Sequence, residues 1–199
     1  MRLELLPRQW EFDPLAVKWL LQVEPPQLED GRSDLDRLTL AVQQDWGKRP
    51  VDYSLLGLRI LADTLRISQG QVTATIVRDS GRLHVINIEP GDTTLRHYAV
   101  AIDVGTTTIA VQLINLAVAQ IVAAQSDYND QIACGLDVIS RINYAHSPGH
   151  LEELRTRVLG TINRLIHQAA RSRGVDPGEI SNAAVSGNTV MTHLLLGLT

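Results

Sequence analysis

The sequence has little cysteine, no excess of basic charge and no long apolar run. Cys134 is its single cysteine, so the chain by itself can form neither a disulfide nor an all-cysteine metal cluster. Its 18 lysines and arginines are scattered and are outnumbered by 22 acidic residues, which gives a net charge of −4. Because nucleic-acid binding needs a basic stripe, we expect no nucleic-acid partner.

Signals for insertion into a membrane or for export are also missing. The sequence has no run of about 20 apolar residues, so no membrane span is expected. Met1–Pro7 lacks the apolar core and small-residue cleavage site of a signal peptide. With a single cysteine, this favours a reducing cytoplasm. At 199 residues, with 44% hydrophobic and 20% charged residues, the chain is expected to fold as one or two domains.

Residues 1–33 are predicted to form a linker or arm. Prolines at positions 7, 14, 25 and 26 disfavour a helix in this segment. Its aromatic residues Trp10, Phe12 and Trp19 are too apolar for a free linker. We therefore expect them to dock, either on the domain that follows or on another segment.

Residues 34–94 are predicted to form a compact middle domain of two helices and two strands. The first helix is expected to begin at Ser33 or Asp34 and the second at Asp52 or Ser54, since these residue types cap helices. Alternating apolar residues predict strands at 71–78 and 82–88, with a hairpin turn between them. No motif that suggests chemistry occurs in this domain.

Residues 95–199 are predicted to form an α/β domain with a mixed sheet. Strands are expected at 98–104, from 108 to about 114, at 121–124 and at 180–185; helices are expected at 137–142, from 151 to 169 and after Asn188. This order of strands and helices suggests a mixed sheet with a right-handed crossover through the long amphipathic helix.

The turn after the first of these strands, at residues 103–108, is a candidate site for binding phosphate groups. Alternation places Ile102 on one face of this strand and Asp103 on the other, and a charged residue at the end of so apolar a run costs free energy unless it has a partner. Gly105 allows a tight turn, and Thr106, Thr107 and Thr108 add hydroxyl groups. A carboxylate for a hydrated cation, with amides and hydroxyls for oxyanions, suits a nucleoside triphosphate with magnesium. The alternative is a plain hairpin whose threonines reflect strand propensity.

A second strand–turn–helix junction lies at Ser186–Thr189. Gly187 is at the turn and Asn188 is the expected helix cap, and a helix N-terminus is a natural anion site. The alternative reading is an N-cap without a ligand. In the helix expected at 137–142, Asp137 and Arg141 are four residues apart and are therefore able to pair.

Several blocks together resemble a known family. The turn motif at 101–108 resembles the first phosphate motif of the superfamily of acetate and sugar kinases, Hsp70 and actin. The combination of blocks resembles, more narrowly, the reductive activators of corrinoid enzymes. These blocks are residues 25–30 with 33–38, residues 101–108, residues 135–142 and residues 187–195.

The resemblance implies a fold and an activity. It implies a linker at 1–33, a middle domain at 34–94 and, at 95–199, the first part of a ribonuclease H-like, actin-like ATPase domain. Such activators use ATP to drive the reduction of an inactive Co(II) corrinoid protein to Co(I) for methyl transfer. The implied partners are a corrinoid protein or corrinoid methyltransferase, together with ferredoxin-like and C-terminal ATPase segments that this sequence does not contain.

The resemblance also implies roles for individual residues. Asp103 is expected to hold Mg²⁺ through water. The phosphates of ATP are expected to contact Gly105, Thr106, Thr107, Thr108, Gly187, Asn188 and Thr189. Less strongly matched residues, expected to line the same cleft, are Asn129, Gln131, Asp137 and Arg141.

Departures from the family's pattern limit what this chain is expected to do alone. Its one cysteine cannot ligate the [2Fe–2S] cluster of the family. Asp130 stands where the family usually has proline, which is expected to loosen the loop around it.

The second phosphate motif and the adenosine motif of the superfamily lie outside the sequence. We therefore expect the isolated chain to bind ATP weakly or not at all, because one wall of a two-lobed cleft cannot enclose a nucleotide. Isothermal titration calorimetry tests this expectation, and a micromolar affinity would contradict it.

Two other functions are consistent with the sequence. The first is a fragment of a small-molecule kinase of the sugar or acetate type, which would need a general base facing the γ-phosphate. The second is a non-enzymatic module that docks a corrinoid or redox partner. A cysteine-rich segment upstream and a glycine-rich nucleotide motif downstream would favour the activator over both.

Overall fold

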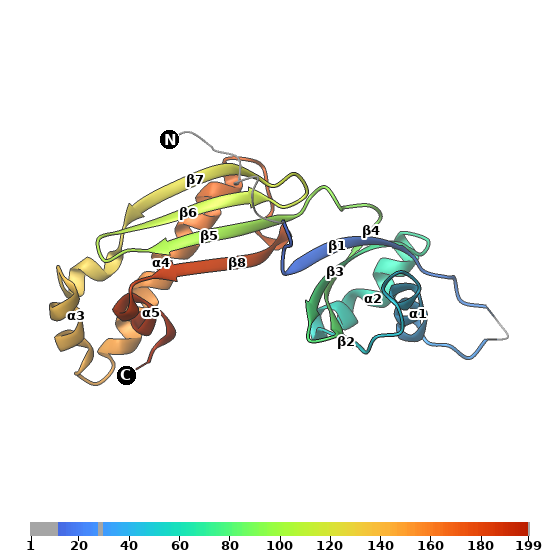
Figure 1. The fold of residues 1–199 in the computed structure, drawn as a ribbon, viewed down its shortest axis with the longest axis horizontal. Coiled ribbons are helices and arrows are strands. Elements are labelled where there is room, and N and C mark those ends of the chain that lie inside the picture. The colour runs from blue at the N-terminus through green and yellow to red at the C-terminus, as the bar shows by residue number, and fades with distance from the viewer. Residues whose placement is uncertain (1–11, 28–29, 199) are drawn as a thin grey trace. The chain divides into compact units, whose positions relative to one another are not determined.

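The chain folds into two compact α/β units, each built on a four-stranded mixed sheet (Figure 1). A computed structural model describes residues 12–27 and 30–198. The first unit spans Phe12–His97, and the second contains the described residues from Tyr98 onward. Mixed sheets with helices confirm the predicted fold class.

The first unit has the strand order β1-β3-β4-β2. Its strands are β1 (Ala16–Gln22), β2 (Val51–Tyr53), β3 (Gln71–Asp79) and β4 (Arg82–Pro90), and its helices are α1 (Asp34–Trp46) and α2 (Leu55–Ile67). The predicted hairpin joins β3 to β4, with positive φ angles of 45° at Ser80 and 82° at Gly81. Two positive φ angles are typical of a type I′ turn, which matches the right-handed twist of the strands. Leu38, Ile76 and Leu83 are fully buried in its core.

Strand β1 lies in the segment expected to be a linker. It pairs antiparallel with β3 along its whole length, and Ala16 is completely buried. The expected border at residue 33 therefore falls inside a compact unit. Trp19 docks on helix α1 of the same unit, as expected of this aromatic residue. Its indole nitrogen donates to Asp45 at 2.7 Å, and its ring packs edge-on against Trp46. Trp10 lies outside the described residues.

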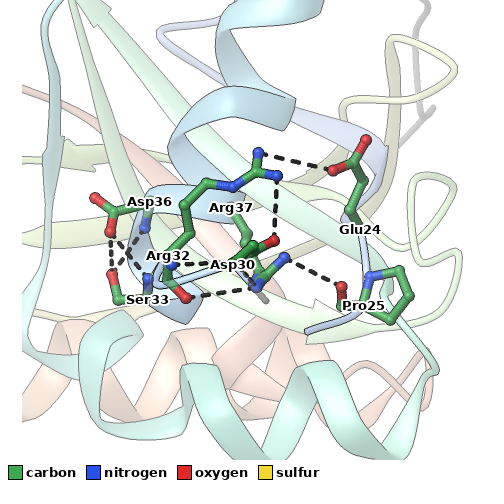
Figure 2. A network of polar contacts seen from close by, with 7 residues as sticks. All are labelled: Glu24, Pro25, Asp30, Arg32, Ser33, Asp36 and Arg37. Carbon is green, nitrogen blue, oxygen red and sulfur yellow. Dashed lines mark hydrogen bonds and ion pairs between the residues drawn. The ribbon is translucent and has the colours of Figure 1, made fainter. Parts of the chain in front are cut away.

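A polar network fixes the start of α1 (Figure 2). Ser33 is the N-cap, and its hydroxyl and backbone N–H exchange hydrogen bonds with Asp36 in a capping box. The nearly buried Arg37 donates to Asp30 and to the carbonyl oxygen of Pro25. The described residues around the proline pair are thus bound to the helix that follows them.

The second unit has the strand order β7-β6-β5-β8. Its strands are β5 (Tyr98–Val104), β6 (Thr108–Asn115), β7 (Gln120–Tyr128) and β8 (Ile180–Gly187); its helices are α3 (Val138–Ala145), α4 (His150–Arg171) and α5 (Thr189–Leu196), with short 3₁₀ turns at Asp130–Cys134 and Pro177–Glu179. Strands β5, β6 and β7 are antiparallel, and β8 is parallel to β5, as the crossover predicts. Strand β7 runs on to Tyr128, four residues beyond the expected end at residue 124.

Helix α4 covers one face of this sheet, and α3 and α5 lie near the end at which β5 and β8 finish (Figure 1). Val100, Ile102 and Val104 of β5 face the core beneath α4, whereas Asp103 is exposed. The alternation of β5 therefore places a carboxylate on the open face at the end of the strand. Within the described residues, we find no helix with the length and apolar character needed to cross a membrane.

Candidate functional site

The two turns singled out in the sequence lie side by side. Strands β5 and β8 are parallel neighbours, with Asp103 paired to Ser186 and Val104 paired to Gly187. Both strands therefore end at the same edge of the sheet, where ligands of α/β proteins usually bind. The sheet thus brings the turn after β5 together with the turn before α5.

The turn after β5 is tight because Gly105 has no side chain. Its N–H donates to the carbonyl oxygen of Thr108 at 3.1 Å. A Cβ on Gly105 would lie 2.5 Å from that oxygen, a separation that real Cβ atoms do not tolerate. The side chains of Thr107 and Thr108 are exposed beside the turn. The glycine is therefore required by the close approach of two backbone segments.

Asp103 lies at the open side of this turn. Its carboxylate accepts a hydrogen bond from the Ser186 hydroxyl at 3.2 Å and is otherwise exposed. It borders a depression of about 810 Å³ over the sheet face, whose lining includes Ala101, Thr108 and Ser126. Among the described residues, no group of three or more His, Cys, Asp or Glu side chains could hold a metal ion. A single carboxylate suits Mg²⁺, which keeps several waters and takes further ligands from phosphates.

The second turn contacts the first through Asn188. The side-chain oxygen of Asn188 accepts from the N–H of Met191 at 3.0 Å, which confirms Asn188 as the cap of α5. The side-chain nitrogen of Asn188 donates to the Thr106 hydroxyl at 3.2 Å. A Cβ on Gly187 would lie 3.1 Å from the Val104 carbonyl oxygen, so the two turns pack closely. Thr189 opens α5 and lines a separate, mainly apolar pocket with residues of α3.

Three of the weaker candidates lie beneath the turn. Asn129, Gln131 and Arg141 are completely buried. Asn129 binds the carbonyl oxygen of Gly105 through its side chain at 3.0 Å and that of Thr107 through its backbone N–H at 2.9 Å. Arg141 binds the carbonyl oxygen of Thr106 at 2.7 Å. We expected these residues to line the cleft; they instead support the turn from the protein interior.

Asp137 and Arg141 are within reach of each other along the helix but form no salt bridge. Asp137 is the exposed N-cap of α3 and accepts from the N–H of Ser140 at 2.7 Å, and this hydrogen bond lowers the pKa of Asp137. Arg141 instead points into the interior, where burial lowers the pKa of its guanidinium. Helical spacing brought the two residues within reach, but capping and the turn's carbonyl groups provided better partners.

Asp130 does not loosen its loop. It forms an ion pair with Arg164 of α4 at 3.0 Å, and its N–H donates to the Thr161 hydroxyl at 3.3 Å. The hydrogen bond from Arg164 lowers the pKa of Asp130. A proline here could not make the backbone bond. Contacts with α4 thus hold the segment that carries Asn129 and Gln131.

Two residues of this arrangement were not predicted. Ser186 faces Asp103 on the neighbouring strand, and its place directly before Gly187 was the available signal. Met191 is 1% exposed, and its sulfur lies 3.4 Å from Arg141. No sequence signal distinguishes this methionine from an ordinary core residue of α5.

The chain matches two models of one protein family. Residues 98–199 match the region described as "RACo middle region", and residues 6–95 match the "RACo linker region". The border between these matches lies beside the border between the two compact units, at His97 and Tyr98. The first of these matches covers just over half of the chain.

Individual proteins are also similar. The corrinoid activation enzyme RamQ of Eubacterium limosum is 34% identical over 102 residues, which are 51% of this chain and 17% of RamQ. A solved structure described as "Reductive activator for corrinoid,iron-sulfur protein" is 38% identical with a TM-score of 0.81, over 96% of this chain and 30% of that one. An archaeal actin homolog, Ta0583, is only distantly similar, with 16% identity and a TM-score of 0.32 over 76% of this chain and 63% of that one. The chain thus spans less than a third of the length of the first two proteins.

Proposed function

The chain belongs to the RACo family of reductive activators of corrinoid proteins, and we propose that its second unit forms one wall of an ATP site in such an activator. The observation that carries this proposal is the junction of two turns at one sheet edge. An exposed carboxylate, a glycine turn and a capped helix N-terminus meet there. Together they offer the groups that a magnesium nucleotide requires.

Each residue has a distinct role in the proposed site. Asp103, through water, would hold Mg²⁺, which supplies charge neutralisation for the phosphates. The turn from Gly105 to Thr108 would bind phosphate oxygens through N–H and hydroxyl groups. Gly187 permits the close approach of the second turn, and Asn188 with Thr189 presents the N-terminus of α5 to the same phosphates. Asn129, Gln131 and Arg141 keep the first turn in shape without touching the ligand.

The proposed reaction couples ATP hydrolysis to an unfavourable electron transfer. One electron reduces the Co(II) corrinoid of a partner protein to Co(I), and ATP is hydrolysed to ADP and phosphate. The electron comes from an iron–sulfur donor that this chain's single cysteine cannot ligate. The part proposed for this chain is to bind and orient the phosphates and the magnesium ion.

Reduction of a Co(II) corrinoid protein tests the proposal. We expect a full-length RACo-family protein that carries this sequence, supplied with a reduced electron donor, to form Co(I) faster with ATP and Mg²⁺ than with ADP and Mg²⁺. The visible absorption of the corrinoid reports the rate. Equal rates with the two nucleotides would contradict the coupling, and a phosphorylated small molecule in place of Co(I) would favour a kinase.

A further inference from the structure

Arg141 is a buried cation that no carboxylate in the described part of the chain contacts directly; the exposed Asp137 attracts it only at longer range. Its side chain is completely buried. It donates to the carbonyl oxygens of Thr106 at 2.7 Å and Gly135 at 2.9 Å, and to the side-chain oxygen of Gln131 at 3.1 Å. All these acceptors are neutral. Burying a charge is costly unless it is paired, so its position beneath the turn requires an explanation.

The hydrogen bonds around Arg141 orient three consecutive peptide groups. Asn129 binds the carbonyl oxygens of Gly105 and Thr107, and Arg141 binds the carbonyl oxygen of Thr106 between them. In a trans peptide the N–H points away from the preceding carbonyl group, and the described chain has no cis peptide bonds. The N–H groups of Thr106 and Thr107 must therefore point away from the buried network.

These outward N–H groups have no hydrogen-bond acceptor within the described residues. They lie in a turn whose hydroxyl groups are partly or fully exposed, beside the end of the strand that carries Asp103. Unbonded N–H groups over a buried positive charge form a site of positive potential. Such a site favours a phosphate group.

We propose that Arg141 is a positioning residue, which holds the turn with its N–H groups outward and supplies the buried charge that a bound phosphate balances. This inference rests on the proposed function, since it concerns the phosphates of the same nucleotide. Its guanidinium suits the role, because its rigid fork of five donors reaches several acceptors at once. A lysine keeps the charge but cannot reproduce the fork.

Comparing the binding of ATP with that of adenosine, which has no phosphates, distinguishes a role of Arg141 in phosphate binding from a general role in folding. In a full-length RACo-family protein that carries this sequence, we expect Arg141→Met to weaken ATP binding at least tenfold and adenosine binding less than twofold. Arg141→Lys is expected to fall between Arg141→Met and the unaltered protein. The matched control is Arg171→Met, which removes an exposed arginine from α4 of the same unit and should change neither affinity. Isothermal titration calorimetry measures all four proteins.

Equal weakening of ATP and adenosine binding by Arg141→Met would overturn the inference, as would an unchanged ATP affinity. If Arg141→Met does not fold, Arg141→Lys provides the test. A larger loss of ATP affinity than of adenosine affinity in this variant supports the inference, and equal losses overturn it. If the unaltered protein binds no ATP, the proposed function is wrong. The proposal that a bound phosphate balances the charge of Arg141 is then wrong as well.

Amide hydrogen exchange tests the positioning of the turn without a nucleotide. The Gly105 and Asn129 amides donate to carbonyl groups of the turn and should exchange at least tenfold faster in Arg141→Met than in Arg171→Met. Equal exchange rates in the two variants would show that Arg141 does not hold the turn.

Discussion

Asp103→Asn should lower the rate of ATP turnover at least about a hundredfold in a full-length RACo-family protein that carries this sequence. Asparagine keeps the size of the side chain and can still accept from Ser186, but it removes the negative charge proposed to hold hydrated Mg²⁺. The release of phosphate from ATP measures turnover. The midpoint of thermal unfolding should change little, because Asp103 is exposed.

Two matched variants control this experiment. Glu152→Gln removes a carboxylate from the exposed side of α4, where its side chain is 66% exposed, and should leave turnover unchanged. Ser186→Ala removes the hydroxyl that donates to Asp103 and should lower turnover far less than Asp103→Asn. ATP hydrolysis by Asp103→Asn at the unaltered rate would remove Asp103 from the proposed magnesium site.

Gly105→Ala should both weaken ATP binding and destabilise the second unit. The new Cβ would lie 2.5 Å from the carbonyl oxygen of Thr108, so the turn must open and its N–H groups must move. We expect ATP affinity to fall at least tenfold, and the free energy of unfolding to fall by about 1–3 kcal/mol, the usual cost of overpacking. Calorimetry measures the first effect and denaturant unfolding the second.

Gly160→Ala is the matched control for Gly105→Ala. Gly160 lies on the exposed side of α4, and a Cβ there would have no neighbour within 4 Å. Because alanine favours the interior of a helix, we expect a stabilisation of about 0.5–1 kcal/mol and no change in ATP affinity. If both glycine variants bind ATP as tightly as the unaltered protein, the close approach at Gly105 is not needed for the site.

Periodicity predicted most of the fold. The apolar stripe of α4 predicted the burial of Leu154, Val158 and Leu165 against the sheet. Alternation in β5 predicted that Asp103 would lie on the opposite face from Ile102. These patterns could be read because each arises from the local geometry of a helix or a strand.

Strand β1 could not be recognised in the same way. It lies between prolines, and its burial does not alternate, since Ala16 and Leu21 are buried while Trp19 and Leu20 are exposed. Its strand conformation is stabilised by pairing with β3, whose residues lie 49 to 61 positions later in the chain. Strand propensity depends on such partners, which a local pattern does not contain.

The sequence by itself determined the turn after β5, because a glycine between an aspartate and three threonines restricts the local backbone and its chemistry. Only the tertiary structure decided which residues support that turn. Asp137 and Arg141 are one helical turn apart, yet one caps α3 at the surface and the other lies buried beneath the carbonyl group of Thr106. The physical reason is that a buried charge is stabilised by every acceptor around it, and these acceptors come from segments far apart in the sequence.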